Sequence, residues 1–209
     1  MKNLFIKICG ITNAKDAYLA VSFGANALGF MMYQKSPRYI PQQEVKEILK
    51  ELPDEIVPVM VFVDPSPEYV DSCLNLSSKI IPQFHGSETQ EFCSSFNRDF
   101  IKAIRVSKKE DVVASFEKYP NSWMLLFDSY RKDKFGGTGT SFDWSYLING
   151  DYKKAYIVAG GLNSNNVEKV LSLTSCAGLD ISSGVESSPG KKDFVKMKKF
   201  INIARKFHV

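Results

Sequence analysis

Eight short apolar runs, separated by segments with helical spacing, constrain the fold of this chain more than any other feature. Between the first two runs, Ala17, Ala20, Val21 and Gly24 lie three or four residues apart, as on one face of a helix. Strands and helices that alternate in this way form a parallel sheet with right-handed crossovers, and eight such units close into a barrel. The apolar runs are 4–9, 27–32, 56–63, 79–84, 100–106, 123–128, 155–161 and 177–182.

The sequence therefore predicts an α/β fold, a single (β/α)8 TIM barrel domain over residues 1–209. Helix-capping residues stand where the helices should begin: Asn13 before the first, Ser66 before the third, Ser141 before the sixth and Asn163 at the seventh. A doubly wound open sheet is the structural alternative. It is disfavoured because no Gly-x-Gly-x-x-Gly follows the first run.

Two glycine-rich exits follow the seventh and eighth runs. Gly160 and Gly161 end one run, and Ser183 and Gly184 follow the other. Glycine lets the main chain approach an anion without a Cβ in the way, and a helix starting at Asn163 would add its positive end. Each exit alone is as consistent with a tight turn. Together, after strands 7 and 8 of a barrel, they predict a phosphate site.

Size and composition suit one well-buried domain, with 209 residues of which 44% are hydrophobic. No apolar stretch reaches membrane-spanning length, so we expect a cytoplasmic protein with no membrane partner. The cysteines Cys9, Cys73, Cys93 and Cys176 form no Cys-x-x-Cys pair, which argues against a disulfide framework or a zinc site.

The net charge of +4 comes with a cluster of basic residues near the C-terminal end. We interpret the cluster as a solvated helix face, because it interleaves with an apolar stripe at Phe194, Met197, Ile201 and Ala204 and not with stacking aromatics. No nucleic-acid partner is expected, while a mild positive charge agrees with a small anionic substrate. The basic residues are Lys191, Lys192, Lys196, Lys198, Lys199, Arg205 and Lys206.

Reacting groups in a barrel lie at the carboxyl ends of the strands, where this chain places Cys9, Arg38, His85 and Asp128. Each also has a structural interpretation: Cys9 as a small buried hydrophobe, Arg38 as a brace for its own loop, His85 as a hydrogen-bonded rim residue and Asp128 as a turn cap. Asp128 ends a strongly apolar run and precedes a long loop that contains Gly137. A carboxyl group on the floor of a pocket that such a loop can cover suits a general acid.

Lysines and histidines bear on two other mechanisms. Lys7 alternates in step with Cys9, so both should point into the barrel, where Lys7 either reacts or holds a carboxylate. Lys102 also lies in a predicted strand, so a Schiff-base enzyme stays open. His85 and His208 are the only histidines, and they cannot form a two-histidine metal site at the strand ends. We therefore expect no metal.

The chain resembles the phosphoribosylanthranilate isomerases of tryptophan biosynthesis from the first strand to the last helix. The resemblance rests on a set of motifs in the order of that family. They are Lys7-Ile8-Cys9-Gly10-Ile11-Thr12, Ser36-Pro37-Arg38-Tyr39-Ile40, Val61-Phe62-Val63, Gln83-Phe84-His85-Gly86, Gly136-Gly137-Thr138-Gly139 with Phe142-Asp143-Trp144, Ala159-Gly160-Gly161-Leu162, Asp180-Ile181-Ser182-Ser183-Gly184-Val185-Glu186 and Pro189-Gly190-Lys191-Lys192-Asp193.

The resemblance implies an Amadori rearrangement of a phosphosugar substrate without a cofactor. Cys9 matches the family's general base, Asp128 its general acid and Arg38 the residue that holds the anthranilate carboxylate. Asp180 matches a residue near the ribose hydroxyls, and His85 a substrate-binding position. The phosphate would rest on the glycine-rich exits with help from Gly137.

Three points stay open at this level. Cys9 would react as a thiolate, so its ordinary pKa of about 8.5 would have to be lowered by its surroundings or by a cationic intermediate. Pro82 lacks a donor N–H and departs from the family, so irregular pairing of strand 4 is expected. The alternative functions are a related sugar-phosphate isomerase of the histidine-pathway type, which uses paired aspartates, and a non-catalytic phosphate-ligand binding protein. We expect a monomer in preference to a homodimer.

Overall fold

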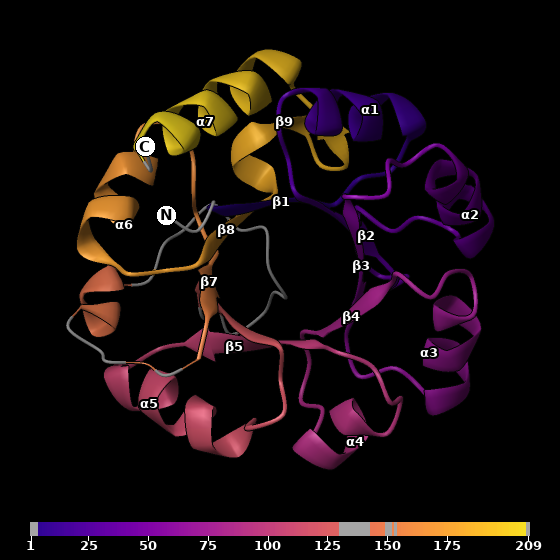
Figure 1. The fold of residues 1–209 in the computed structure, drawn as a ribbon, viewed down its shortest axis with the longest axis horizontal. Helices are drawn as coiled ribbons and strands as arrows, with labels where there is room; N and C mark the ends of the chain where they lie inside the picture. The colour runs from indigo at the N-terminus through magenta and orange to yellow at the C-terminus, as the bar shows by residue number, and fades with distance from the viewer. Residues whose placement is uncertain (1–3, 130–142, 149–151, 153, 208–209) are drawn as a thin grey trace.

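The chain folds into a closed barrel of eight parallel strands with helices around the outside (Figure 1). The computed structural model describes residues 4–129, 143–148, 152 and 154–207. The strands fall within or beside the eight predicted runs, which confirms the predicted (β/α)8 barrel. They are β1 (Phe5–Cys9), β2 (Ala27–Met31), β3 (Val57–Phe62), β4 (Ile81–Phe84), β5 (Ile101–Val106), β6 (Met124–Ser129), β7 (Tyr156–Val158) and β8 (Gly178–Ile181).

Helices and short turns of helix connect the strands. Asn13 and Ser66 cap their helices as predicted, each accepting a hydrogen bond from a backbone N–H in the first turn. The described helical segments are α1 (Ala14–Ser22), α2 (Gln42–Lys50), α3 (Pro67–Leu74), α4 (Gln90–Ser94), α5 (Lys109–Lys118), the 3-10 turn η1 (Trp144–Leu147), α6 (Val167–Leu173), the 3-10 turn η2 (Ser183–Val185) and α7 (Phe194–Phe207).

Three details of the helix prediction are wrong. Gly24 lies beyond the end of α1 with φ of 102°, so it belongs to the turn and not to the helix. The seventh helix begins at Val167, because Asn163 forms a turn in which its side chain accepts from Asn165 N. Phe194, predicted to be part of the apolar stripe, is 59% exposed, whereas Met197, Ile201 and Ala204 are buried. The predicted cap Ser141 lies outside the described residues.

The last basic cluster also differs from the prediction. Lys191 and Lys192 form β10 (Lys191–Lys192), which pairs antiparallel with β9 (Glu186–Ser188). Lys192 is only 7% exposed, so it is not part of a solvated helix face. The short β9–β10 hairpin lies between β8 and α7 in the sequence, and its position brings Lys192 to the end of β1.

Strand register explains which side chains meet inside the barrel. β1 pairs with β2 on one side and with β8 on the other, which closes the barrel, and Lys7 stands opposite Asp180 in this register. The predicted irregularity at Pro82 is absent from the β3–β4 register, where Pro82 pairs with Met60 without a shift. Pairing of β4 with β5 starts at Gln83, one residue after the proline.

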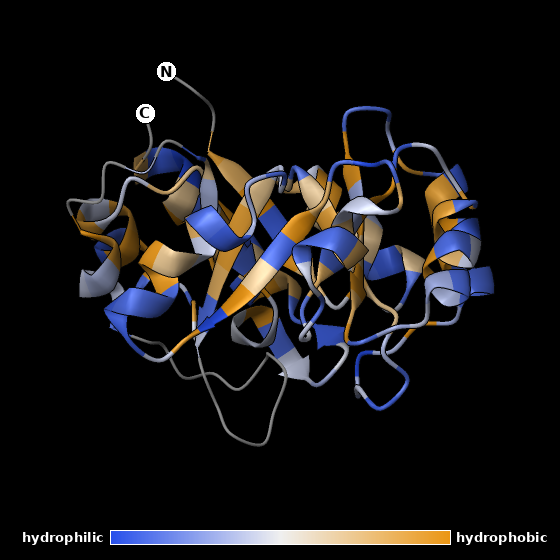
Figure 2. Cartoon of the chain, turned by 90° about the horizontal axis from the view of Figure 1, so that it is seen from below, coloured by the Kyte–Doolittle hydropathy of each residue, from blue (hydrophilic) through white to orange (hydrophobic). Residues whose placement is uncertain are grey.

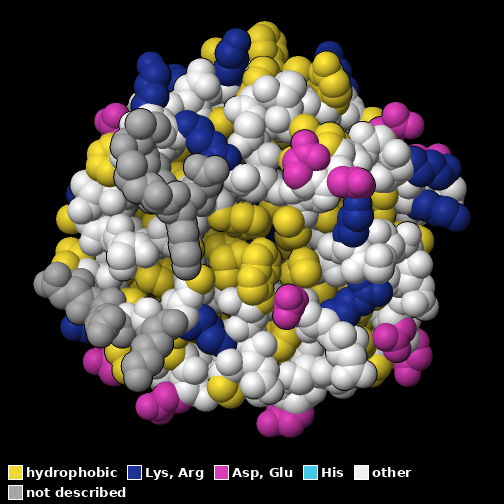
Figure 3. Space-filling view, in the orientation of Figure 1, with side chains coloured by type: hydrophobic (Ala, Val, Ile, Leu, Met, Phe, Trp, Pro, Cys, Tyr) yellow, Lys and Arg dark blue, Asp and Glu magenta, His cyan; other side chains and the backbone are white. Residues whose placement is uncertain are grey.

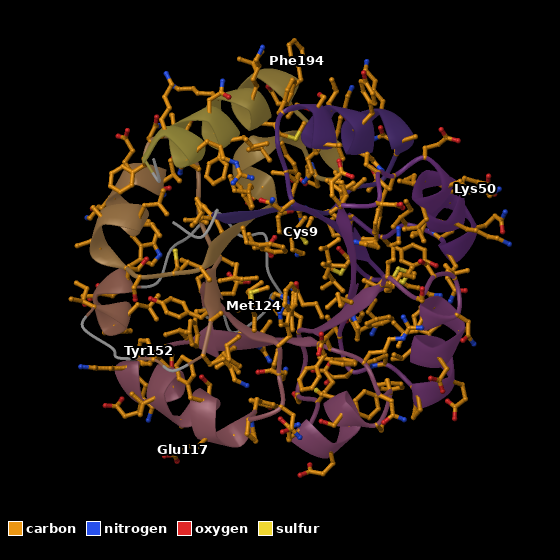
Figure 4. The ribbon with its side chains drawn as sticks, viewed as in Figure 1. Cys9, Lys50, Glu117, Met124, Tyr152 and Phe194 are labelled. Carbon is orange, nitrogen blue, oxygen red and sulfur yellow. The ribbon has the colours of Figure 1, made fainter. Side chains whose placement is uncertain are left out.

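The alternation of side chains along the strands divides the core into two layers. The larger layer lies between strands and helices; Figure 2 shows strands that are mostly hydrophobic and helices with many hydrophilic positions. The inner layer fills the barrel and includes Cys9, Val61, Ala103, Leu126 and Ile157. Figure 4 places Cys9 and Met124 inside the ring of strands and Lys50, Glu117 and Phe194 at the outer edge. Figure 3, in the same orientation, shows hydrophobic side chains gathered at the centre of this face.

Among the described segments, no helix has the length and apolar character needed to cross a membrane.

Candidate active site

A pocket lies at the carboxyl ends of the strands and contains every predicted site residue that the structure describes. Gly137 lies outside the described residues. Side chains from the ends of β1, β2, β4 and β6 form one side, which we call the charged rim: Cys9, Arg38, His85 and Asp128. Main chain after β7 and β8 forms the other side, which we call the glycine rim: Gly160, Gly161, Ser183 and Gly184.

Cys9 stands beside a buried ion pair. Lys7 and Cys9 lie two positions apart on β1, so both point into the barrel as the alternation predicted. The Lys7 ammonium is fully buried and lies 3.0 Å from Asp180 Oδ1 and 3.0 Å from Oδ2. Gly29 on β2 makes room for them: a Cβ there would lie 2.8 Å from Cys9 Sγ and 3.0 Å from Lys7 Cε. Lys7 therefore holds a carboxylate, which was one of its two predicted roles.

The surroundings of Cys9 do not lower the pKa of its thiol. Burial raises this pKa and the charge of Asp180 adds to the increase, while Lys7 and Lys192 act in the opposite direction without reversing it. Burial alone would lower the pKa of Lys7, but the charges of Asp180 and Cys9 outweigh burial and the pKa ends above its ordinary value. The pocket thus favours a neutral thiol beside an ammonium, so of the two alternatives left open by the sequence, the cationic intermediate is the one that remains.

Asp128 lies on β6, which is separated from β1 by β7 and β8, and it is buried. Its Oδ1 accepts a hydrogen bond from Ser129 N at 2.7 Å, which fixes one oxygen. Its Oδ2 lies 3.2 Å from His85 Nε2, a contact that falls short of hydrogen-bond geometry. Gln83 Nε2 lies 3.4 Å from the other ring nitrogen of His85. One carboxyl oxygen is therefore held by the main chain, while the other faces a histidine.

Arg38 is held by a carboxylate that the sequence analysis gave no role. Arg38 Nε donates to Glu186 Oε1 at 2.9 Å, and Arg38 Nη2 donates to Oε2 at 2.7 Å. Lys192 Nζ also donates to Glu186 Oε1, at 2.9 Å, and to the carbonyl oxygen of Cys9, at 2.5 Å. The Arg38 side chain is 11% exposed and lines the pocket. Arg38, in the loop after β2, is thus bonded to Glu186, in the hairpin after β8.

Close main-chain packing shapes the glycine rim. Gly160 and Gly161 have φ of 79° and 68°, a conformation that favours glycine. A Cβ on Gly160 would lie 2.6 Å from Asp128 Oδ1, and a Cβ on Gly184 would lie 1.9 Å from the Leu162 carbonyl oxygen. The loops after β7 and β8 therefore pack against each other, and Gly160 also packs against the carboxylate of Asp128. The helix α6 begins beyond this rim, so its end is not part of the pocket lining.

Several buried polar atoms in the pocket wall have no hydrogen-bond partner: Gln83 Oε1, His85 Nε2 and Ser182 Oγ. Buried polar groups are normally paired, and those at a pocket are available to a ligand or water. The wall also contains Gln83, Met31, Ser36 and Ser182, which the sequence analysis did not single out. Gln83 and Ser36 stand in motifs that it quoted, so their position in those motifs was the available signal. Among the described residues, no three His, Cys, Asp or Glu side chains group as metal ligands.

Fold and pocket together define an enzyme of the (β/α)8-barrel class, with carboxyl, thiol and cationic side chains in one pocket with glycine-rich main chain. The profile of the family described as N-(5'phosphoribosyl)anthranilate (PRA) isomerase matches residues 6–203. The chain therefore belongs to this family of isomerases of tryptophan biosynthesis.

Individual relatives with this activity in their names align with nearly the whole of this chain. N-(5'-phosphoribosyl)anthranilate isomerase of Marinomonas sp. (strain MWYL1) is 41% identical over 203 residues, covering 97% of this chain and 98% of the relative. The crystal structure of phosphoribosyl anthranilate isomerase from Thermotoga maritima is 36% identical, with a TM-score of 0.89, and the match covers 97% and 99% of the two chains. A third relative, 35% identical with a TM-score of 0.86 and the same coverage, is described in complex with reduced 1-(o-carboxyphenylamino)-1-deoxyribulose 5-phosphate.

Proposed function

We propose that this pocket converts N-(5'-phosphoribosyl)anthranilate into 1-(2-carboxyphenylamino)-1-deoxyribulose 5-phosphate, with Asp128 as general acid and Cys9 as general base. The observation that carries the proposal is the arrangement of one buried carboxyl group and one thiol on separate strands, opposite a glycine-lined anion site. The reaction needs an acid and a base at different atoms of one phosphosugar. It needs no cofactor, because the substrate nitrogen serves as the electron sink.

The acid acts first. Asp128 protonates the ring oxygen, the furanose opens and an iminium cation forms at C1. The Ser129 N–H held by Asp128 Oδ1 leaves Oδ2 as the oxygen that carries the transferable proton. His85 Nε2 at 3.2 Å is the group best placed to orient that oxygen.

The base then removes the proton from C2. A thiolate is required, and burial in the free protein raises the pKa of Cys9. The iminium cation adds its positive charge to that of the Lys7 ammonium beside Cys9, and both favour the thiolate. Cys9 releases its thiol proton to solvent as the cation forms, and the resulting thiolate then takes the proton from C2.

The two ends of the substrate bind to the two rims. Arg38 binds the anthranilate carboxylate, since a guanidinium edge matches a carboxylate through parallel hydrogen bonds. The phosphate rests on Gly160, Gly161, Ser183 and Gly184, which line the pocket, and the three glycines allow the main chain to approach an anion closely. Asp180 is bound to Lys7, so its contact with the ribose hydroxyls is made by an oxygen shared with that ammonium.

The decisive test is turnover of N-(5'-phosphoribosyl)anthranilate, followed as loss of its anthranilate fluorescence. Rapid loss of fluorescence with wild-type protein is expected, and a rate equal to the uncatalysed background would refute the activity. The histidine-pathway aminoaldose is the discriminating second substrate. Because Cys9 stands where that class of isomerase uses an aspartate, we expect turnover of the anthranilate substrate to exceed turnover of the second substrate.

We further propose that the protein acts as a monomer in the cytoplasm. The proposal rests on the pocket containing an acid, a thiol and a cationic side chain without any residue from a second copy. One solved relative, from Thermotoga maritima, is described as monomers generated from a dimeric isomerase. Light scattering at working concentration gives the mass directly, and a mass twice that of the chain would overturn the proposal.

A further inference from the structure

The carboxylate of Glu186 lies buried between two cations at the edge of the pocket. Its side chain is 4% exposed, and it receives hydrogen bonds from Arg38 and Lys192. Burial would raise the pKa of this carboxyl group, but hydrogen bonds from Arg38 and the charge of Lys192 outweigh burial and lower it. Glu186 is thus an ionised group placed within reach of the proposed substrate site.

The way Glu186 binds Arg38 decides which donors remain. A guanidinium carries five N–H groups: one on Nε and two on each terminal nitrogen. Glu186 takes the Nε edge, because its two oxygens bond to Arg38 Nε and Nη2. Among the described residues, no acceptor is hydrogen-bonded to Arg38 Nη1. The edge formed by Nη1 and the second N–H of Nη2 therefore stays available for another carboxylate.

The carboxylate that holds Arg38 is itself fixed from the opposite side. Lys192 Nζ bonds to Glu186 Oε1 and to the carbonyl oxygen of Cys9. Lys192 is buried, and its backbone N–H donates to Asp16 Oδ2 at 2.9 Å. The position of Glu186 is therefore tied to the end of β1, where Cys9 stands, and to the first helix.

Charge balance supports the same arrangement. Arg38 and Lys192 each carry one positive charge and Glu186 carries one negative charge, so the three groups together leave one positive charge. One additional carboxylate at the free edge of Arg38 would complete the pairing. A neutral group at that edge would leave the guanidinium without a second acceptor, which is unfavourable for a charge that is largely buried.

We propose that Glu186 is a positioning residue for substrate specificity: it holds the Nε edge of Arg38 so that the opposite edge faces the aromatic carboxylate of the substrate. The proposal rests on the proposed role of Arg38. Glu186 makes no contact with the substrate in this arrangement. It acts mainly on KM for substrates that carry the carboxylate. Because Lys192 links Glu186 to the end of β1, any change in kcat should be small and equal for substrates with and without that group.

The test compares two substrates with Glu186→Gln. The amide keeps the shape of the side chain but presents an NH2 group to one of the two Arg38 donors. On N-(5'-phosphoribosyl)anthranilate we expect kcat/KM to fall about 10- to 100-fold, mainly through KM. On the N-(5'-phosphoribosyl)aniline analogue, which lacks the carboxylate, we expect less than a threefold change. An equal loss on both substrates would overturn the proposal, because Glu186 would then support the fold of the pocket in general.

Two further variants distinguish a specific effect on Arg38 from a general effect of removing a buried carboxylate or from loss of folding. Glu88→Gln is the matched control, since Glu88 is also a buried carboxylate paired with a lysine, Lys102 at 3.0 Å, but unlike Glu186 it makes no bond to Arg38. It should leave the ratio of the two substrates at the wild-type value. If Glu186→Gln does not fold, Glu186→Asp keeps the charge while shortening the reach, and the same substrate-selective rise in KM is expected.

The double variant Arg38→Ala with Glu186→Gln completes the design. If Glu186 acts through Arg38, the second substitution adds less than a threefold change to the loss caused by Arg38→Ala alone. Independent, multiplying losses would overturn the proposal. Failure of the proposed function looks different: the wild-type protein itself would not turn over the anthranilate substrate, or Arg38→Ala would harm both substrates equally.

Discussion

The two rims of the pocket are built by different means. On the charged rim, polar side-chain atoms make the contacts: Arg38 is bonded to Glu186, and Asp128 contacts Ser129 and His85. On the glycine rim, the main chain at Gly160 and Gly184 packs so closely against its neighbours that no Cβ fits. The charged rim depends on particular side-chain groups, whereas the glycine rim depends on residues that have no side chain.

In the proposed mechanism, the charged rim carries the proton-transfer and carboxylate-binding groups, and the glycine rim holds the phosphate. Substitution on the charged rim removes a reacting or binding group while the main chain stays in place. Substitution on the glycine rim adds atoms and must move main chain or neighbouring side chains, because Gly160 already packs against Asp128 and Gly184 against Leu162. Variants of the charged rim should therefore change mainly the catalytic rate and substrate affinity. Variants of the glycine rim should change mainly the free energy of unfolding and phosphate binding.

The largest effect is expected from Asp128→Asn and Cys9→Ala. Each removes a proton-transfer group, so kcat should fall about 10²- to 10⁴-fold while KM changes much less. Steady-state kinetics with the anthranilate substrate measures both constants. Asp128→Asn is the sharper variant, because the amide keeps the shape and loses only the transferable proton. Near wild-type kcat in either variant, with chemistry limiting turnover, would remove that residue from the mechanism.

Arg38 should have the next largest effect, on binding. Arg38→Ala loses hydrogen bonds to a charged group worth roughly 1.5 to 3 kcal/mol, so kcat/KM should fall about 10- to 150-fold. Arg38→Lys should also lose affinity, since a point charge cannot copy two parallel bonds. The aniline analogue without the carboxylate is the control. A loss of the same size on the analogue would mean that Arg38 only supports its loop.

Gly160→Ala probes the glycine rim, with Gly24→Ala as its matched control. Both glycines have positive φ, so both variants should lose about 1 to 3 kcal/mol of unfolding free energy. Only at Gly160 would the new Cβ lie within 2.6 Å of a site residue, whereas at Gly24 the nearest atom is 3.8 Å away. We expect a roughly tenfold loss of kcat/KM for Gly160→Ala and none for Gly24→Ala. Equal activity in the two variants would contradict the anchoring role of this rim.

The smallest effect concerns pH. The pKa of Cys9 and that of Lys7 are both raised in the folded protein, so the fold holds these protons more tightly than the unfolded chain does. As pH rises above about 8.5, the unfolded chain loses its thiol proton first, and the unfolding free energy decreases by up to about 1.4 kcal/mol per pH unit for each such group.

Denaturant unfolding between pH 7.5 and 10 measures this slope. Cys9→Ala should reduce the slope by the contribution of one thiol, because burial also raises the pKa of Cys73, Cys93 and Cys176. The affinity of the glycine rim for inorganic phosphate should change little over the same range, since that rim carries no ionisable side chain. Parallel slopes for wild type and Cys9→Ala would show that the Cys9 pKa is not raised in the folded protein.

The barrel could be predicted from sequence because strand length and period are local properties. The ends of the helices could be predicted from the sequence less accurately. Asn163 and Asn166 both have the chemistry of a cap, and only the turn that Asn163 makes with Asn165 decides that the helix starts later. Local capping preference cannot choose between neighbouring candidates when tertiary packing selects the turn.

The charged rim could be predicted only in part. Cys9 and Asp128 stand at strand ends, which the sequence reveals. The partner of Arg38 lies 148 positions away along the chain, and Lys192 lies in a basic stretch that resembles a solvated helix face. Pairing over such distances depends on barrel closure and leaves no local pattern. For the same reason, the direction of the Cys9 pKa could not be read from residue type alone.

The ion pair between Lys7 and Asp180 has a consequence for the order of folding. The two residues are 173 positions apart, and they meet only where the first strand joins the last. A nascent or truncated chain without β8 would have to bury a lysine with no counterion, which disfavours any compact intermediate that closes early around β1. The thiol beside Lys7 thus gains its final environment in the last topological step. Catalytic activity therefore requires that β8 has paired with β1 and closed the barrel, so partly folded molecules contribute nothing to turnover.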